Sequence, residues 1–235
     1  MSSELIIAFL TLTFLEIVLG IDNIIFISIV TNKLPEEQQG KARRIGLLLA
    51  MGFRVLLLLG ITWLIGFSEP LFSVADMEFS GRDLILLAGG LFLLGKSTME
   101  IHHKVEGVAS RPGIEGKKAS FGSTLMQIVL LDLVFSFDSI LTAVGLTQNI
   151  PVMIAAVVAS ILVMMAFATR ISDFINKHPS LQILALSFLM LIGFMLAIEA
   201  FEQHVPKGYI YFAVFFSMAV EMLNMRYRKK ADSKE

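Results

Sequence analysis

Apolar stretches long enough to cross a hydrocarbon core of about 30 Å recur along the whole chain. Polar, charged or proline-bearing segments separate each stretch from the next. The seven stretches cover residues 5–30, 45–67, 84–101, 121–146, 152–171, 181–201 and 209–225. The pattern therefore predicts an all-α polytopic membrane protein with seven transmembrane helices.

Composition supports this interpretation. Hydrophobic side chains make up 56% of the 235 residues and charged side chains 17%, with a mean hydropathy of +0.78. A soluble protein with this many buried helices would have too little polar surface to cover it. The chain has no cysteine, which excludes disulfides, thiolate nucleophiles and cysteine metal sites. Its net charge of -1 indicates no nucleic-acid partner, and the lipid bilayer is the expected surrounding.

The basic residues predict an orientation in the membrane. With the N-terminus outside and the C-terminus in the cytoplasm, the outer segments carry only Arg82 and Lys207. The inner segments then carry Lys33, Lys41, Arg43, Arg44, Lys104, Arg111, Lys117, Lys118, Arg170, Lys177, Arg226, Arg228, Lys229, Lys230 and Lys234. Cytoplasmic loops are the ones enriched in Lys and Arg, so this arrangement is the expected one.

The first and fourth apolar stretches resemble each other. TLTFLEIVLGIDNIIF, from position 11, aligns with QIVLLDLVFSFDSILT, from position 127, so that Glu16 meets Asp132. Asp22 then meets Asp138, and Asn23 meets Ser139. Three helices separate each copy from the other, so the two copies enter the membrane from opposite sides, as in inverted-topology repeats.

The repeat divides the chain into four predicted parts. Residues 1–103 form the first three-helix repeat and residues 120–203 the second. Residues 104–119 form a cytoplasmic linker between them, and residues 204–235 form the seventh helix with a basic cytoplasmic tail. Transporters built this way bind substrate near the midplane, where the repeats meet.

Acidic residues at the predicted midplane require a partner. An Asp at the centre of a membrane helix costs about 2.5 to 3.5 kcal/mol. Arg54 is the only basic residue deep in a predicted span, either as a counter-ion or as a side chain that reaches toward the interface. One guanidinium does not neutralise four carboxylates, so we expect an exchangeable cation. Oxygen ligands without cysteine suit Mn²⁺, Mg²⁺ or Ca²⁺.

The spacing of the acids has a geometric consequence. Residues six apart on a regular helix point about 120° from each other, so Glu16 and Asp22 would not share a face. A local break at Gly20, and one at Ser136 in the other copy, would turn both acids of each pair inward. The alternative is a structural role for the acids, with interhelical hydrogen bonds that hold the bundle together. Paired aspartates also occur in intramembrane proteases, but the accompanying short motifs are missing, so we expect no enzyme.

Five segments carry a family resemblance: EIVLGIDN, ARRIG, RDLILLAGGLFLL, LLDLVFSFDS and HVPKGYIYFA. The chain resembles the TerC family of bacterial integral membrane proteins, above all the short YgdQ-like members. The resemblance implies the lysine-exporter-like superfamily, two three-helix repeats, the bacterial plasma (inner) membrane and export of divalent metal, chiefly manganese. The family's acidic motifs fall on Glu16, Asp22, Asn23, Asp132, Asp138 and Ser139.

These observations lead to one hypothesis and one alternative. The leading hypothesis is a secondary transporter that exports a divalent cation, with Mn²⁺ first and Ca²⁺ or Mg²⁺ as other candidates. The six motif residues would bind the cation, Arg54 would be its counter-ion, and proton coupling would follow from exchange of metal for protons. No other cofactor is expected, and a homo-oligomer is compatible with the sequence. The alternative is a non-transporting membrane component that senses ions or organises partners around a structural metal site.

Overall fold

The computed structural model describes residues 3–74, 77–106, 120–201, 203 and 205–232. Most of these residues are helical. The helices are α1 (Ser3–Thr31), α2 (Glu36–Leu59), α3 (Ile61–Gly66), α4 (Gly81–Val105), α5 (Phe121–Leu146), α6 (Ile150–Asn176), α7 (Pro179–Glu199) and α8 (Lys207–Asp232), and the strands are β1 (Pro70–Val74) and β2 (Met77–Ser80). The prediction of an all-α polytopic membrane protein is confirmed, with one short hairpin added.

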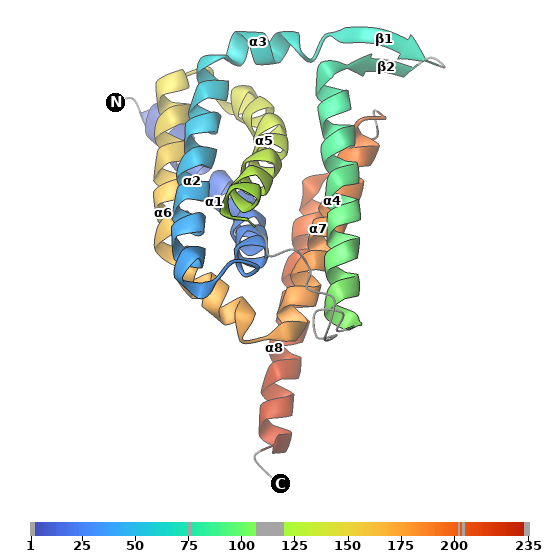
Figure 1. Cartoon of the computed structure of the whole chain (residues 1–235). Helices are drawn as coiled ribbons and strands as arrows, with labels where there is room; N and C mark the ends of the chain where they lie inside the picture. Colours follow the sequence, from blue (N-terminus) through green and yellow to red (C-terminus); the bar gives the residue numbers. More distant parts are fainter. Residues whose placement is uncertain (1–2, 75–76, 107–119, 202, 204, 233–235) are drawn as a thin grey trace.

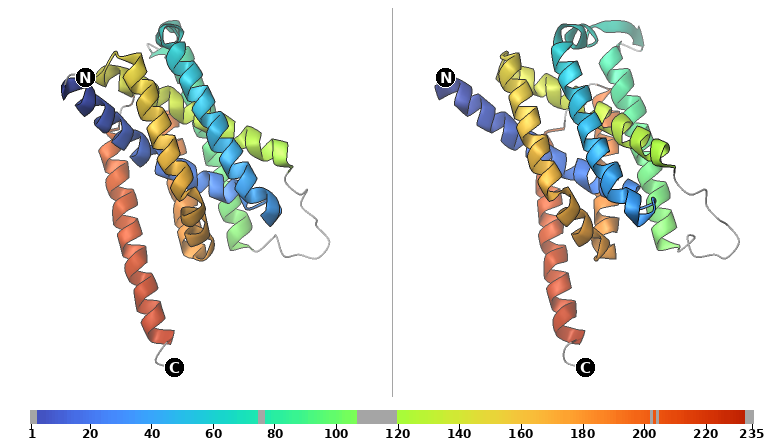
Figure 2. Two further views of the ribbon diagram at one scale, coloured as in Figure 1. Left: turned by 90° about the vertical axis from the view of Figure 1, so that its left-hand side faces the viewer. Right: turned by 60° about the vertical axis from the view of Figure 1, so that its left-hand side comes forward.

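The long helices lie side by side, and successive ones run in opposite directions (Figure 1). α1 packs against α6, while α2 packs against both α5 and α6. α4 packs against α7 to form a second group, and α8 packs on α7 and extends beyond the other helices (Figures 1 and 2). The functional residues described below lie where α1, α2 and α5 meet inside the first group.

Six described helices are long and apolar enough to cross a membrane: α1, α4, α5, α6, α7 and the Gly208–Tyr227 part of α8. The predicted span over residues 45–67 is not among them. The first turns of α2 are highly charged, and its apolar part ends at Gly60, before the roughly 20 residues that a span needs. Beyond Gly60 the chain continues as the short helix α3, which lies across the end of the bundle (Figure 1).

The antiparallel hairpin of β1 and β2 follows α3 at the same end of the molecule. Phe72 pairs with Phe79, and their rings stack with centroids 5.6 Å apart. Ser80 then caps α4 by accepting a hydrogen bond from the Asp83 backbone N–H, while the Asp83 side chain accepts from the Ser80 backbone N–H. This capping box fixes the start of α4.

Glycines let α4 and α7 cross at close range. A Cβ atom on Gly90 would lie 2.5 Å from the Gly193 carbonyl oxygen, and one on Gly193 would lie 2.9 Å from the Gly90 carbonyl oxygen. Real Cβ atoms do not approach so closely, so any larger residue would push the backbones apart. Small residues at helix crossings are a general device of membrane bundles.

Replacing Gly90 with Val should therefore lower the thermal stability of the purified protein. Overpacking of this kind costs about 1 to 3 kcal/mol, and here the obstacle is backbone. Gly95→Val is the matched control, because a Cβ at Gly95 meets no atom within 4 Å and the change in helix propensity is the same. The measurement is the Tm of both variants in detergent. Equal values for Gly90→Val and Gly95→Val would contradict the role of the crossing.

The predicted helix breaks are wrong. α1 continues through Gly20 and α5 continues through Ser136. Gly20 instead allows close packing on α6, because a Cβ there would lie 2.2 Å from the Met164 sulfur. The Ser136 hydroxyl donates a hydrogen bond to Oδ2 of Asp132, one turn earlier on the same helix. Both small residues thus serve packing and hydrogen bonding within regular helices.

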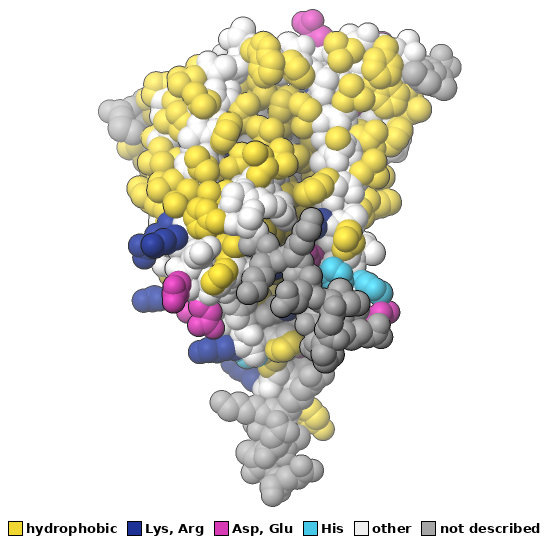
Figure 3. Space-filling model, viewed as in Figure 1, with side chains coloured by type: hydrophobic (Ala, Val, Ile, Leu, Met, Phe, Trp, Pro, Cys, Tyr) yellow, Lys and Arg dark blue, Asp and Glu magenta, His cyan; other side chains and the backbone are white. Residues whose placement is uncertain are grey.

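Charged side chains are distributed unevenly over the surface. In Figure 3, hydrophobic side chains cover the upper part of the molecule, whereas Lys and Arg gather toward the lower end. Exposed apolar residues such as Leu56, Trp63 and Phe215 have 63%, 63% and 76% of their surface open, as expected where lipid replaces water. The basic residues near the ends of α1, α4 and α6 and near the start of α2 belong to this lower end. Arg111, Lys117 and Lys118 lie outside the described residues.

Candidate functional site

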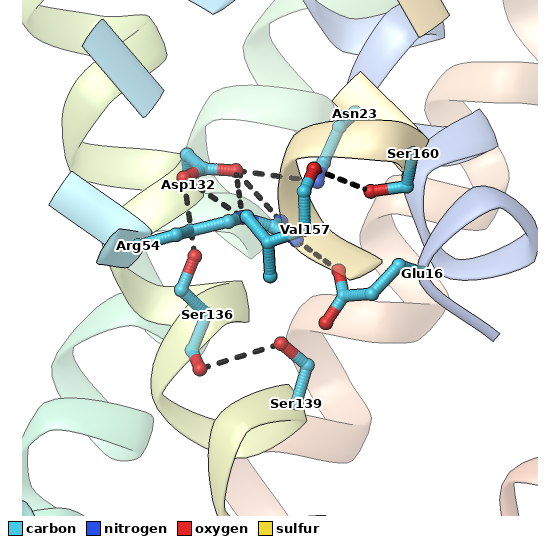
Figure 4. Close-up of polar contacts among 8 residues, drawn as sticks. All are labelled: Glu16, Asn23, Arg54, Asp132, Ser136, Ser139, Val157 and Ser160. Atoms are coloured by element: carbon cyan, nitrogen blue, oxygen red, sulfur yellow. Dashed lines mark hydrogen bonds and ion pairs between the residues drawn. The ribbon is translucent and has the colours of Figure 1, made fainter. Parts of the chain in front are cut away.

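Two buried carboxylates from different helices meet a single buried guanidinium. Glu16 comes from α1, Arg54 from α2 and Asp132 from α5 (Figure 4). Their exposed fractions are 5%, 2% and 7%. Charged groups are found at such low exposure only when they are paired, and here three helices supply the partners. We refer to Glu16, Arg54 and Asp132 as the central cluster.

Arg54 contacts Asp132 through two nitrogens. Nη2 donates to Oδ1 at 2.8 Å, and Nε lies 3.2 Å from Oδ1 and 3.3 Å from Oδ2. Nη1 donates to Oε2 of Glu16. The guanidinium thus bridges two carboxylates, a geometry for which its planar set of donors is suited. Two carboxylates and one guanidinium leave the central cluster with one formal negative charge.

Neutral polar groups complete the surroundings of Asp132. Nδ2 of Asn23 lies 3.5 Å from Oδ1, and Oγ of Ser136 donates to Oδ2 at 3.1 Å. Oγ of Ser139 donates to the Ser136 carbonyl oxygen at 3.3 Å, so this hydroxyl is directed along α5 (Figure 4). Among the described residues, the Asp132 carboxylate contacts only hydrogen-bond donors. A cation could reach it only after Arg54 has moved aside.

The structure brings together some of the residues that the sequence predicts to form the cation site. Glu16, Asn23, Arg54, Asp132 and Ser139 lie in one region of the bundle. The side chains of Asp22 and Asp138 lie outside the described residues, so their predicted place at the site stays a prediction. Among the side chains that are described, no group of three or more His, Cys, Asp or Glu lies close enough to hold a metal ion.

Two cavities adjoin the central cluster. The larger one, of about 80 Å³, is lined by Asn23, Arg54 and Ser139 at its inner part and by α7 and α8 residues such as Glu199 and Tyr211 toward the hairpin end. The smaller one, of about 10 Å³, is lined by Asn23, Arg54, Asp132 and apolar residues of α1, α2, α5 and α6. Asn23 and Arg54 line both cavities, so these two side chains lie between them.

Three polar residues near the site were not predicted from the sequence to act there. Ser136 hydrogen-bonds Asp132, and its spacing of four residues on one helix is a signal that could have identified it. Ser160, fully buried on α6, donates to the Val157 carbonyl oxygen at 2.9 Å. Glu199 lines the larger cavity and ion-pairs with Arg82 at 2.5 Å, a contact between α7 and α4 that no local pattern indicates.

Comparison with known proteins gives a match over the whole chain. A family model described as integral membrane protein TerC family matches residues 1–235. The UPF0053 inner membrane protein YgdQ of Escherichia coli (strain K12) is 54% identical over 94% of this chain and 92% of its own length. A UPF0053 protein of Haemophilus influenzae is 50% identical over 95% of this chain and 94% of its own length.

A longer relative matches as well. The UPF0053 inner membrane protein YoaE of Escherichia coli (strain K12) is 48% identical over 94% of this chain, which spans 42% of YoaE. No solved structure matches the chain. The family resemblance that the sequence motifs predict is therefore confirmed. The names of the Escherichia coli relatives give a location in the inner membrane, and none of the three names gives a substrate.

Proposed function

Because the chain belongs to the TerC family of integral membrane proteins, we propose that it is a secondary transporter that exports a divalent cation, with Mn²⁺ as the leading candidate. The observation that carries the proposal is the central cluster, in which two buried carboxylates share one guanidinium. A formal negative charge at bilayer depth calls for an exchangeable cation or proton.

In this proposal Arg54 occupies the site when no metal is bound. A divalent cation displaces the guanidinium from Asp132 and Glu16 and takes their oxygens as ligands. Asn23 and Ser139 supply neutral oxygens, and Asp22 and Asp138 add carboxylates. This donor set is hard and oxygen-based, as Mn²⁺, Mg²⁺ and Ca²⁺ prefer. Loss of the metal returns the site to Arg54 or to protons, so proton coupling follows from the same chemistry.

The two cavities support alternating access. Asn23 and Arg54 lie between a cavity of about 80 Å³ on the side of the hairpin and one of about 10 Å³ on the side of the basic end. The packing pattern is compatible with an inverted repeat in which α1 corresponds to α5, α2 to α6 and α4 to α7. Under this correspondence, the contact between α1 and α6 is the counterpart of the contact between α5 and α2, and both contacts are present. In such repeats one half moves against the other around a fixed site.

Orientation and location complete the proposal. We place the basic end in the cytoplasm, the N-terminus outside, and the protein in the bacterial inner membrane, the location given in the names of the Escherichia coli relatives. Although its apolar part is shorter than a full span, we propose α2 as the seventh span, because it packs against α5 and α6 and runs beside them along the bundle (Figure 1). Compartment-sensitive reporters fused to each terminus test this orientation, and an outward-facing C-terminus would contradict it.

A second candidate function is favoured by the same cluster. The carboxylates of Glu16 and Asp132 already have a protein cation as partner, so the cluster forms without a metal. A protein that senses ions or organises partners, without transporting, would use such a site to hold α1, α2 and α5 together. The two functions differ in whether the purified protein alone moves ions.

The test is a flux measurement in proteoliposomes. Purified protein is reconstituted with a metal-sensitive dye inside, and Mn²⁺, Ca²⁺ or Mg²⁺ is added outside with and without a pH gradient. We expect protein-dependent flux of Mn²⁺ that exceeds that of the other two ions and changes with the gradient. Metal binding without flux would contradict transport and support the sensing function.

A further inference from the structure

A carboxylate lies at the outer part of the larger cavity. Glu199, at the end of α7, lines this cavity together with Asn23 and Ser139, which adjoin the central cluster. About 18% of the surface of its side chain is exposed, so the side chain is neither buried nor freely solvated. Among the described residues that line the cavity, Glu199 is the only acid and Arg54 the only base; most of the others are apolar.

Glu199 is held by a basic residue from another helix. Nη2 of Arg82, in the first turn of α4, lies 2.5 Å from Oε1 of Glu199. This arrangement repeats that of the central cluster, where Arg54 holds the carboxylates of Glu16 and Asp132. In both places a guanidinium pairs with a carboxylate; Glu199 lines the larger cavity, whereas Asp132 lines the smaller one.

Arg82 has a second acidic neighbour. Its Nη1 lies 3.6 Å from Oδ1 of Asp83, whose other oxygen, Oδ2, accepts from the backbone N–H and the hydroxyl of Ser80. If a cation takes the Glu199 carboxylate, Arg82 therefore keeps a carboxylate partner on its own helix. Release of Glu199 leaves no uncompensated guanidinium, which keeps the exchange energetically small.

We propose that Glu199 is a second cation-binding residue, at the outer end of the path to the central cluster, and that Arg82 forms an ion pair with it when no cation is bound there. The inference rests on the proposed transport function and extends it to a site that a divalent cation meets before or after the cluster. The Glu199 carboxylate attracts cations into an otherwise apolar cavity and raises their local concentration there.

The concentration dependence of flux tests this role. Mn²⁺ is applied to proteoliposomes whose orientation is established with a C-terminal tag, so that the metal reaches the cavity from the hairpin end. Glu199→Gln should raise the half-saturating Mn²⁺ concentration about fivefold to tenfold, because a nearby negative charge is lost. Arg82→Gln should lower it, because the carboxylate keeps its charge and loses its competitor. Glu199→Asp should leave the half-saturating Mn²⁺ concentration close to that of the unmodified protein.

The matched control is Glu78→Gln, on the exposed face of β2 at the same end of the molecule. It makes the same change of charge away from the cavity and should leave the half-saturating concentration unchanged. A purely structural ion pair predicts that Glu199→Gln and Arg82→Gln shift the value in the same direction, and that result would overturn the inference. So would a Glu199→Gln protein indistinguishable from Glu78→Gln.

Failure of the proposed function has a different signature. If the unmodified protein shows no Mn²⁺ flux at any concentration, transport itself is wrong, and the role of Glu199 with it. If the unmodified protein transports and Asp132→Asn does not, while Glu199→Gln leaves the concentration dependence unaltered, only the inference about Glu199 is overturned. Where Glu199→Gln does not fold, Arg82→Gln and Glu199→Asp decide the matter.

Discussion

Asp132→Asn should reduce divalent-cation flux in proteoliposomes at least about thirtyfold, because loss of one member of a buried, hydrogen-bonded charge pair costs about 2 to 5 kcal/mol. Asn keeps the shape of the side chain and an oxygen that can accept from Arg54 and Ser136. The negative charge is what disappears, and with it the attraction for a divalent cation. The remaining carboxylate of Glu16 is then balanced by Arg54, which leaves no net charge on the central cluster.

The matched control is Asp173→Asn, an exposed aspartate on α6. It makes the same change of charge outside the central cluster, and flux should remain near that of the unmodified protein. Initial rates are compared at equal amounts of reconstituted protein, with the Tm of each variant in detergent as a check on folding. A folded Asp132→Asn protein with undiminished flux would show that the acidic cluster is structural and would exclude the proposed mechanism.

The sequence predicted the membrane fold, and it left two roles open for Arg54, as a counter-ion of the acids or as a side chain that reaches toward the interface. An acid inside an apolar stretch is expensive, so its partner must be nearby, and Arg54 is the one base at similar depth. The structure pairs Arg54 with Glu16 and Asp132, one acid from each copy of the repeated motif. The repeated acidic motif and the depth of Arg54 therefore indicated which helices lie together at the site.

Other features depend on long-range packing that no local pattern contains. Gly20 and Ser136 suggested helix breaks, but the space beside Gly20 is filled by Met164 of α6, and the hydroxyl of Ser136 is used by Asp132. The contact of Gly90 with Gly193 requires the crossing of α4 and α7 to be known first. The Arg82–Glu199 pair likewise joins residues that are 117 positions apart.

Arg54→Gln should lower the Tm of the purified protein by about 6 to 12 °C, if removal of the guanidinium costs about 3 kcal/mol. Without it, the carboxylates of Glu16 and Asp132 are buried at 5% and 7% exposure and lack their shared counter-ion. Arg170→Gln, an exposed arginine on α6, is the matched control and should leave the Tm near its original value. Thermal unfolding in detergent, followed by the fluorescence of Trp63, the single tryptophan, measures the difference.

The double variant Arg54→Gln/Asp132→Asn should be more stable than Arg54→Gln alone. It removes one positive and one negative charge, so the formal charge of the cluster returns to that of the unmodified protein. The two changes are then strongly non-additive, as expected for groups in direct contact. Mn²⁺ should also raise the Tm of Arg54→Gln more than that of the unmodified protein, because the cation no longer competes with a guanidinium for the same oxygens. Additive losses in the double variant, together with no effect of Mn²⁺, would mean that Arg54 stabilises the helices by packing alone and does not hold the place of a transported cation.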